Sequence, residues 1–280
     1  MAKEKRKFKD TIWYTLIMMC IFLLIVPIII QIPFSFFNFT SESNFELSSI
    51  TTDYLLYPGF TLISFIILFM LKENKDIRKI LSFKNNKIIY GLLIGFSLNA
   101  LRVLIAYFCG NVRFGLGSTN MLILLYAFIC VLVQSTSEEI VCRGYLFSKI
   151  LKDYKNPVFA IVFNSLLFAL FHLSNNGIGV VSIISIFVVG IFLSLITYYN
   201  KNIWMAVGFH AMWNFTQNFI FGLPNSGYPA VYSVLKLVDA SDGFAYNKVF
   251  GIEGTVIGII IDCIVIALVY YLHKNKRSKK

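Results

Sequence analysis

The chain has 280 residues, of which 58% are hydrophobic, 16% aromatic and only 14% charged. Since about a quarter of the residues in soluble domains are charged, this composition excludes an ordinary soluble protein and indicates a membrane protein with several spans. The net charge of +11 does not indicate a nucleic-acid partner, because the basic residues are concentrated in alternate loops. That distribution is the positive-inside pattern of membrane proteins.

About eight apolar stretches are long enough, at about 20 residues each, to cross the hydrocarbon core of a bilayer. The predicted spans are residues 12–31, 54–71, 88–109, 121–142, 157–173, 178–199, 203–222 and 254–272. The first is too long for the apolar part of a secretory signal and lacks an A-x-A-like cleavage site, so we expect a retained helix. The sparsely basic loops hold only Arg113, Lys236 and Lys248, so both termini are predicted to be cytoplasmic.

These features predict an all-α, polytopic helical bundle integral to the cell membrane. We divide the chain into an N-terminal three-helix region (1–120), a four-helix core (121–222) and a C-terminal part (223–280) with an external loop, the last helix and a basic tail. The tail is expected to contact anionic lipid head groups. The external loop is either solvated or contains an interfacial helix near residues 231–237.

Two charged residues, Arg102 and Asp262, lie near the middle of predicted spans, where a charge is costly unless it is paired. We expect them to form a structural ion pair between the third and eighth helices rather than to recognise a substrate. The cysteines lie in or beside the spans without C-x-x-C spacing and are interpreted as packing residues.

The fourth predicted span contains adjacent carboxylates, Glu138 and Glu139, followed by Arg143. In a helix, Glu139 and Arg143 lie four residues apart with the glutamate N-terminal, the favourable order for an ion pair. Glu138 points about 100° away and is left free, facing the bundle interior. A free carboxylate at low dielectric suits general-base chemistry. Alternatively, both glutamates belong to a solvated helix end at the cytoplasmic face.

Two further spans each contain a histidine. His172 ends the fifth span, one turn after Phe168 and on the same face. His210 lies four residues before Asn214 in the seventh span, so the side chains of His210 and Asn214 project the same way. Each could be structural, as a core histidine donating to a backbone carbonyl or as a hydrogen bond between helices. Polar groups in three separate membrane helices are costly, however, which favours one common site.

Two kinds of site fit these residues. In the first, Glu138 and His172 activate a water for attack on a carbonyl group, and His210 and Asn214 stabilise the oxyanion. In the second, Glu138, His172 and His210 hold a divalent metal ion such as zinc, whose open position carries the water.

The motifs occur in order on separate predicted helices, as Glu138-Glu139-x-x-x-Arg143, Phe168-x-x-x-His172 and His210-x-x-x-Asn214. This set resembles the three motifs of the CPBP family of intramembrane proteases, which includes the type II CAAX prenyl endopeptidases and the bacteriocin-processing or self-immunity proteins of the Abi group. The resemblance covers roughly residues 121–218. It implies a helical bundle with an intramembrane cavity and a peptide-bond hydrolase activity.

Carried over by position, the resemblance implies that Glu138 and His172 position and polarise the water. His210 and Asn214 would form the oxyanion site, and the glutamate–arginine pair of the first motif would brace that motif. Because the sequence has no H-E-x-x-H pair, we favour a glutamate-dependent mechanism over a metal-dependent one.

The expected substrate is a membrane-associated peptide or protein, either prenylated or leader-peptide-like. Two other classes of function stay open. One is a non-proteolytic membrane regulator or bacteriocin self-immunity protein that binds a partner with the same helices, and its phenotype would survive mutation of Glu138, His172 and His210. The other is a transporter with an ion relay, for which we see no inverted repeat in the sequence.

The predicted depths of the three motifs conflict. At about 1.5 Å per residue, Glu138 lies roughly 8 Å inside the cytoplasmic end set by Arg143, and His210 lies about 10 Å inside the end near Trp204. His172, counted from Pro157, lies roughly 20 Å inside. The fifth helix is therefore expected to tilt, to begin lower than Pro157 or to be sheathed by its neighbours.

Overall fold

A computed structural model of the chain describes residues 13–14, 16–17, 21, 45–56, 58–59, 61–62, 79–83 and 87–278. Most of the predicted spans 12–31 and 54–71 lies outside these residues. Within them, four helices are long and apolar enough to cross a membrane, namely Lys87–Phe108, Met121–Tyr154, Val180–Asn200 and Val256–Asn275. They coincide with the third, fourth, sixth and eighth predicted spans. The total number of spans, the orientation of the termini and the division into domains stay predictions.

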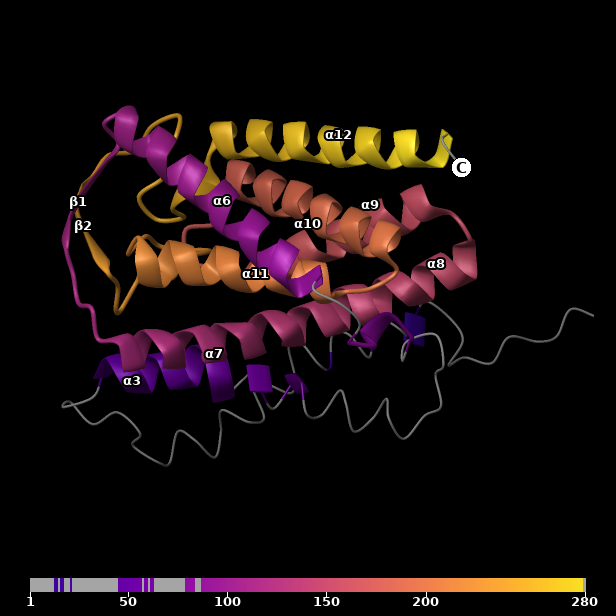
Figure 1. The fold of residues 1–280 in the computed structure, drawn as a ribbon, viewed down its shortest axis with the longest axis horizontal. Coiled ribbons are helices and arrows are strands. Elements are labelled where there is room, and N and C mark those ends of the chain that lie inside the picture. Colours follow the sequence, from indigo (N-terminus) through magenta and orange to yellow (C-terminus); the bar gives the residue numbers. More distant parts are fainter. Residues whose placement is uncertain are drawn as a thin grey trace, which may run out of the picture.

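The described part of the chain is mainly a helical bundle (Figure 1). Its longer helices are α6 (Lys87–Phe108), α7 (Met121–Glu139), α9 (Pro157–Phe171), α10 (Val180–Asn200), α11 (Trp204–Phe215) and α12 (Val256–Ser278). Apolar side chains of α9, α10 and α11 form one core, and those of α6, α10 and α11 form a second. Helix α11, which contains His210, therefore lies at the centre of the bundle.

Helix α7 does not end at the predicted boundary, residue 142. It begins at Met121 and is capped by Asn120, whose side chain accepts hydrogen bonds from the backbone nitrogens of Leu122 and Ile123. It continues into the π-helix η5 (Ile140–Phe147) and the short helix α8 (Ser148–Tyr154), which ends at Lys155 in the left-handed conformation. All eight residues of η5 are buried, so Arg143 lies inside the protein and does not mark the end of this helix.

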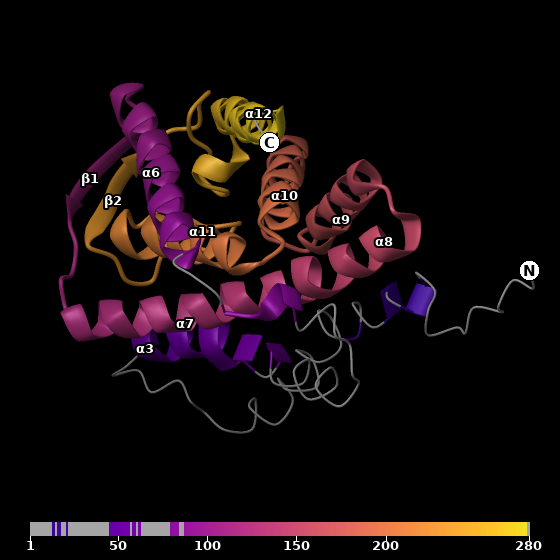
Figure 2. The ribbon, with the colours of Figure 1, turned by 45° about the vertical axis from the view of Figure 1, so that its right-hand side comes forward.

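The fifth helix, α9, begins at Pro157 as predicted. Asn156 caps it by accepting a hydrogen bond from the backbone nitrogen of Phe159, and proline suits the first turn because it has no backbone donor to satisfy. Its last turn ends at His172. Figure 2 shows that the chain turns after α8 and that α9 runs back beside α8 and η5.

Helices α6 and α11 are in very close contact through glycines. A Cβ atom at Gly91 would lie 2.2 Å from the carbonyl oxygen of Met205, and one at Gly95 would lie 2.5 Å from that of Phe209. Two glycines four residues apart let membrane helices approach closely and gain packing energy. This contact fixes the position of the helix that contains His210.

The prediction of an all-α fold is wrong in one detail. Strand β1 (Val112–Leu116) pairs in antiparallel fashion with β2 (Leu235–Ala240), with an irregularity between Arg113 and Phe114. The interfacial helix considered near residues 231–237 is therefore replaced in part by a strand. Residues 235–238 of β2 alternate between partly buried and exposed, which suits a strand, and pairing with β1 satisfies backbone groups that a loop would leave open.

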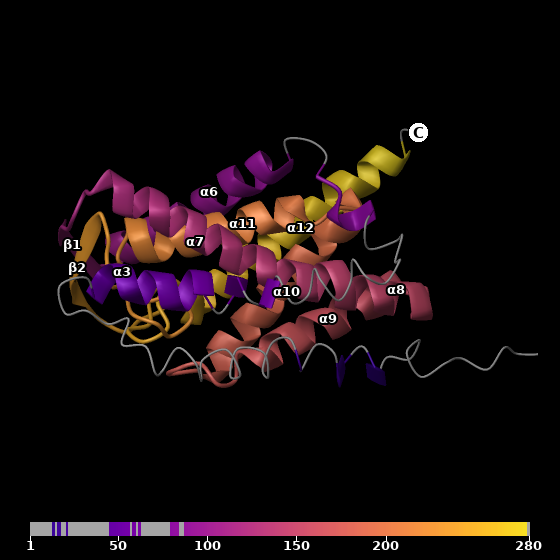
Figure 3. The same ribbon diagram turned by 90° about the horizontal axis from the view of Figure 1, so that it is seen from below.

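A short helical segment lies along α7 (Figure 3). It consists of α3 (Phe45–Ile50) and the π-helix η4 (Thr51–Leu56). Ile50 is fully buried, and the Thr51 hydroxyl lies 2.8 Å from the Tyr126 hydroxyl of α7. Packing against α7 brings Ser49 and Asp53 of this segment to the same cavity as the three motifs.

Candidate active site

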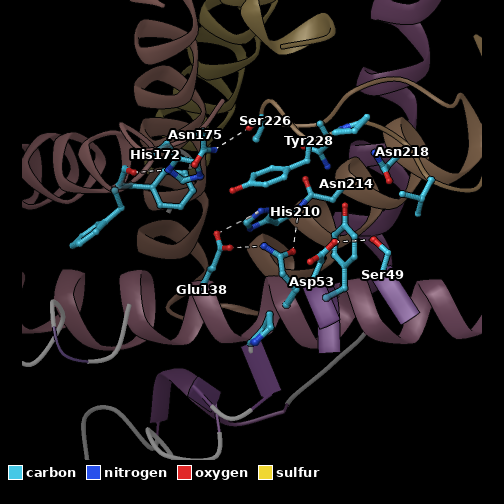
Figure 4. A pocket seen from close by; sticks show the side chains of 18 of the residues that line it. Ser49, Asp53, Glu138, His172, Asn175, His210, Asn214, Asn218, Ser226 and Tyr228 are labelled. Atoms are coloured by element: carbon cyan, nitrogen blue, oxygen red, sulfur yellow. Dashed lines mark hydrogen bonds and ion pairs between the residues drawn. The ribbon is translucent and has the colours of Figure 1, made fainter. Parts of the chain in front are cut away.

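A cavity of about 450 Å³ lies between α7, α9, α11, η4 and the segment that follows α11. All four residues predicted to be catalytic line it: Glu138, His172, His210 and Asn214 (Figure 4). The structure thus brings the three motifs together in one place. The roles predicted for these residues stay predictions.

The conflict in depth between Glu138 and His172 disappears because the helix that contains Glu138 is longer than predicted. Measured from the turn at Lys155, the sixteen residues between Glu138 and Tyr154 span roughly 24 Å, and the fifteen between Pro157 and His172 span roughly 22 Å. The start of α9 was placed correctly. Arg143 does not mark the end of the helix of Glu138, because the helix continues to Tyr154 and this arginine is fully buried beside Glu139.

Glu138 presents its carboxylate to the cavity, with its side chain 28% exposed. Its Oε1 accepts a hydrogen bond from Gln134 Nε2, and its Oε2 lies 3.9 Å from His210 Nε2. As predicted, Glu138 does not pair with Arg143. The alternative of a solvated helix end is wrong, because Glu139 is fully buried and the helix continues beyond it.

Glu139 contacts two partners through one oxygen. Its Oε1 lies 2.9 Å from Arg143 Nη1, which confirms the predicted ion pair, and 3.0 Å from His210 Nδ1. Because a carboxylate only accepts hydrogen bonds, Nδ1 of His210 is the donor. The sequence missed this second contact, which connects the first motif directly to the third.

Arg143 also reaches the second motif through Phe168. Its guanidinium carbon lies 4.1 Å from the centre of the Phe168 ring, a cation–π contact. The backbone carbonyl of Phe168 accepts a hydrogen bond of 2.8 Å from His172 Nδ1. Since the hydrogen of a neutral imidazole is then on Nδ1, Nε2 of His172 keeps a free lone pair.

Gln134 belongs to none of the three sequence motifs, although it lies one turn before Glu138 on the same face of α7. It donates to Glu138, and its Oε1 accepts a hydrogen bond of 3.1 Å from Asn214 Nδ2. The available signal was its spacing, since Gln134 follows the apolar run of residues 121–133 and lies four residues before Glu138. These two of its hydrogen bonds fix the orientation of the carboxylate relative to the carboxamide of α11, and its Oε1 also accepts from the Ser135 hydroxyl.

The rest of the cavity wall is rich in uncharged polar groups. Carboxamides line it at Gln134, Asn175, Asn214, Asn218 and Asn225. The acidic side chains among the described lining residues are Asp53 and Glu138, and Asp53 faces the site from η4. Partial burial raises the pKa of the Asp53 carboxyl, and a hydrogen bond of 3.0 Å from the Ser49 hydroxyl offsets part of this rise.

A second, smaller cavity of about 40 Å³ lies behind the histidines, with Phe168, His172 and His210 in its wall. Glu253, from the short helix η7 (Ile252–Gly254), lines the same cavity. Its Oε1 accepts a hydrogen bond of 2.8 Å from Trp213 Nε1. Sequence analysis placed Glu253 only in an external loop, and no local pattern pointed to the site.

The residues considered as metal ligands do not form a cluster of three. Within the described residues, no three His, Cys, Asp or Glu side chains lie where together they could hold a metal ion. Both histidines nevertheless donate from Nδ1 to an oxygen, as metal-binding histidines usually do. A zinc ion held by Glu138, His172 and His210 stays a prediction, and no step below depends on it.

A comparison with protein families gives one match. Residues 120–216 match the model of the family described as type II CAAX prenyl endopeptidase, Rce1-like. The matched segment contains all three motifs and confirms the resemblance drawn from them. No curated protein matches the chain.

Proposed function

Because residues 120–216 belong to the Rce1-like type II CAAX prenyl endopeptidase family, we propose that the chain hydrolyses a peptide bond in a membrane-associated peptide or protein. The family indicates an intramembrane protease in general. We propose, in addition, which residues are catalytic, how they act and what kind of substrate is cleaved. The observation that carries it is the meeting of Glu138, His172, His210 and Asn214 at one cavity.

Glu138 and His172 are proposed to activate the attacking water. Glu138 has its Oε1 fixed by Gln134 and its Oε2 without a hydrogen bond to any described residue. His172 offers the lone pair of Nε2, because Nδ1 is held by the Phe168 carbonyl. A water between two such acceptors would be oriented with an oxygen lone pair directed away from both and toward the carbonyl carbon.

His210 and Asn214 are proposed to stabilise the oxyanion. Because Nδ1 of His210 donates to Glu139, only a protonated imidazole has a second hydrogen, on Nε2, to donate to an oxyanion. Glu139 and Glu138 both lie beside this ring and favour its positive charge. The group then holds two negative charges, on Glu138 and Glu139, and two positive charges, on Arg143 and His210, so that its net charge is zero.

In the proposed step, the water oxygen forms a bond to the carbonyl carbon, and one water proton passes to Glu138. The carbonyl π electrons move to the oxygen, which becomes the oxyanion. On collapse, the carbon–nitrogen bond breaks, and the proton on Glu138 passes to the departing nitrogen. The products are a carboxylic acid and an amine, and Glu138 is regenerated.

The test is peptide hydrolysis by the purified chain in lipid nanodiscs, with a prenylated peptide and a leader-like peptide in parallel. Glu138→Gln should lower kcat by at least about 100-fold, because it removes the general base while keeping the size of the side chain. Glu46→Gln is the matched control, since Glu46 is exposed on α3 and does not line the cavity. It should leave kcat unchanged.

Unchanged turnover in Glu138→Gln would contradict the mechanism. If neither peptide is cleaved and a cellular phenotype survives mutation of Glu138, His172 and His210, the regulator or immunity protein is the better description. Preference for one peptide identifies the substrate class.

The same assay decides between the two chemistries. A glutamate-dependent enzyme should keep its activity after treatment with a chelator and should contain no stoichiometric metal by elemental analysis. Loss of activity on chelation and recovery with zinc would support a metal held by Glu138, His172 and His210.

A further inference from the structure

A tight turn in the segment after α11 carries Tyr228 into the cavity. The backbone nitrogens and oxygens of Asn225 and Tyr228 form two mutual hydrogen bonds of 2.9 Å. The two central residues, Ser226 and Gly227, have φ angles of 50° and 88°, which is typical of the tightest hairpin turns. A Cβ atom at Gly227 would lie 2.1 Å from the carbonyl oxygen of Asn176, so the turn requires glycine there.

The turn is held from two sides. Asn175, three residues after His172, donates a hydrogen bond of 3.0 Å to the carbonyl of Ser226. On the other side, Oε2 of Glu253 accepts hydrogen bonds from the backbone nitrogen and the hydroxyl of Ser226, at 2.8 and 3.1 Å. The other oxygen of Glu253 is fixed by Trp213 of α11. The turn is thereby attached to the elements that contain both site histidines.

The side chain at the end of this turn points toward the three motifs. Figure 4 shows the Tyr228 ring in the cavity with its hydroxyl directed toward Glu138, His172 and His210. Tyr228 is 53% exposed, and its hydroxyl forms no hydrogen bond with any described residue. A phenol held in this way can donate to a group on a bound substrate.

The oxyanion site proposed above needs such a donor. His210 donates from Nε2 only when it is protonated, and one amide hydrogen of Asn214 is already directed to Gln134. We propose that Tyr228 is a further catalytic residue, whose hydroxyl donates a hydrogen bond to the oxyanion, and that Glu253 is the positioning residue that holds it there. This inference rests on the proposed peptidase function. Tyr228 keeps its proton throughout, so the proton balance of the step is unchanged.

The first experiment compares Tyr228→Phe with the wild-type chain in the nanodisc assay. Loss of one oxyanion donor should lower kcat by about 100-fold and leave KM nearly unchanged. A ring that only packs against the substrate would be replaced fully by phenylalanine, so wild-type kcat in this variant would overturn the inference. Tyr107→Phe is the matched control, since Tyr107 is 51% exposed on α6 and is absent from the cavity wall.

The second experiment tests the positioning role with a double-mutant cycle. Glu253→Ala should lower kcat as Tyr228→Phe does, and the double variant should lose little more than either single variant, because both remove the same interaction. Glu253→Gln keeps an acceptor oxygen and should recover part of the activity. Fully additive losses would overturn the positioning role.

The outcomes separate this inference from the proposed function. If Glu138→Gln is inactive while Tyr228→Phe is normal, the peptidase mechanism stands and only the inference fails. If Glu138→Gln is as active as the wild-type chain, the proposed mechanism fails first. Tyr228→Phe removes one exposed oxygen atom and is expected to fold, which an unchanged melting temperature would verify.

Discussion

At the scale of single residues, Glu139 connects two motifs that are far apart in the sequence. Its buried carboxylate contacts Arg143 in its own helix and His210 in α11. Arg143 in turn lies against Phe168, whose carbonyl holds His172. Glu139, which does not line the cavity, therefore helps to fix the relative positions of His172 and His210, which do.

Replacing Glu139 should reduce both stability and activity. In Glu139→Gln, Arg143 becomes an uncompensated buried charge, and breaking a buried pair in this way costs about 3 to 5 kcal/mol. The free energy of unfolding in detergent should fall by roughly this amount, and turnover should fall because His210 loses the charge that favours its protonation.

A double variant distinguishes the two effects. Glu139→Gln combined with Arg143→Met removes both charges and should recover much of the lost stability but not the activity. Recovery of full activity in the double variant would show that Glu139 serves only to neutralise Arg143.

At the scale of helices, the positions of the motifs depend on how α6 contacts α11 and on where α7 ends. The first is decided by Gly91 and Gly95, which let the α6 backbone lie directly against Met205 and Phe209. The second is decided by the buried π-helical turns of η5, which continue the helix past Arg143. The first feature positions α11 against α6, and the second sets how far Glu138 lies from the end of its helix.

Gly95→Ala tests the helix contact. The added methyl group would lie 2.5 Å from the Phe209 carbonyl oxygen, so the helices must separate, at an expected cost of about 1 to 3 kcal/mol. We expect a lower melting temperature and a lower kcat, since His210 is one residue from Phe209. Gly179→Ala is the control, because nothing lies within 4 Å of its Cβ position. Equal melting temperatures for the two variants would contradict this account.

At the scale of the whole molecule, a buried ion pair attaches the last helix to the core. Arg102 of α6 pairs with Asp262 of α12, as predicted, and also donates a hydrogen bond of 2.9 Å to the carbonyl of Gly258. The guanidinium carbon lies 4.6 Å from the centre of the Trp213 ring, and Trp213 holds Glu253. The pair therefore supports the same network that holds the turn of Tyr228.

Exchanging the two charges tests this attachment. Arg102→Asp and Asp262→Arg should each reduce the yield of folded protein, because each leaves two like charges buried together. The exchanged double variant should recover part of that yield, though not the contacts with Gly258 and Trp213. The measurement is monodisperse protein recovered in size-exclusion chromatography, and a yield no better than that of the single variants would argue against the pairing.

The sequence by itself determined the features that depend on neighbours along one helix. Apolar length predicted the membrane helices, and spacing of four residues predicted the Glu139–Arg143 pair and the shared direction of His210 and Asn214. These follow from helical geometry alone.

Only the tertiary structure decided which groups from different helices meet. The common depth of Glu138 and His172 required the true end of α8, and the link from Glu139 to His210 required the packing of α11 against α7. Tyr228 and Glu253 come from a loop without periodicity, where sequence spacing carries no information on direction. Contacts between elements depend on where helices end and how closely they pack, and no local rule specifies either.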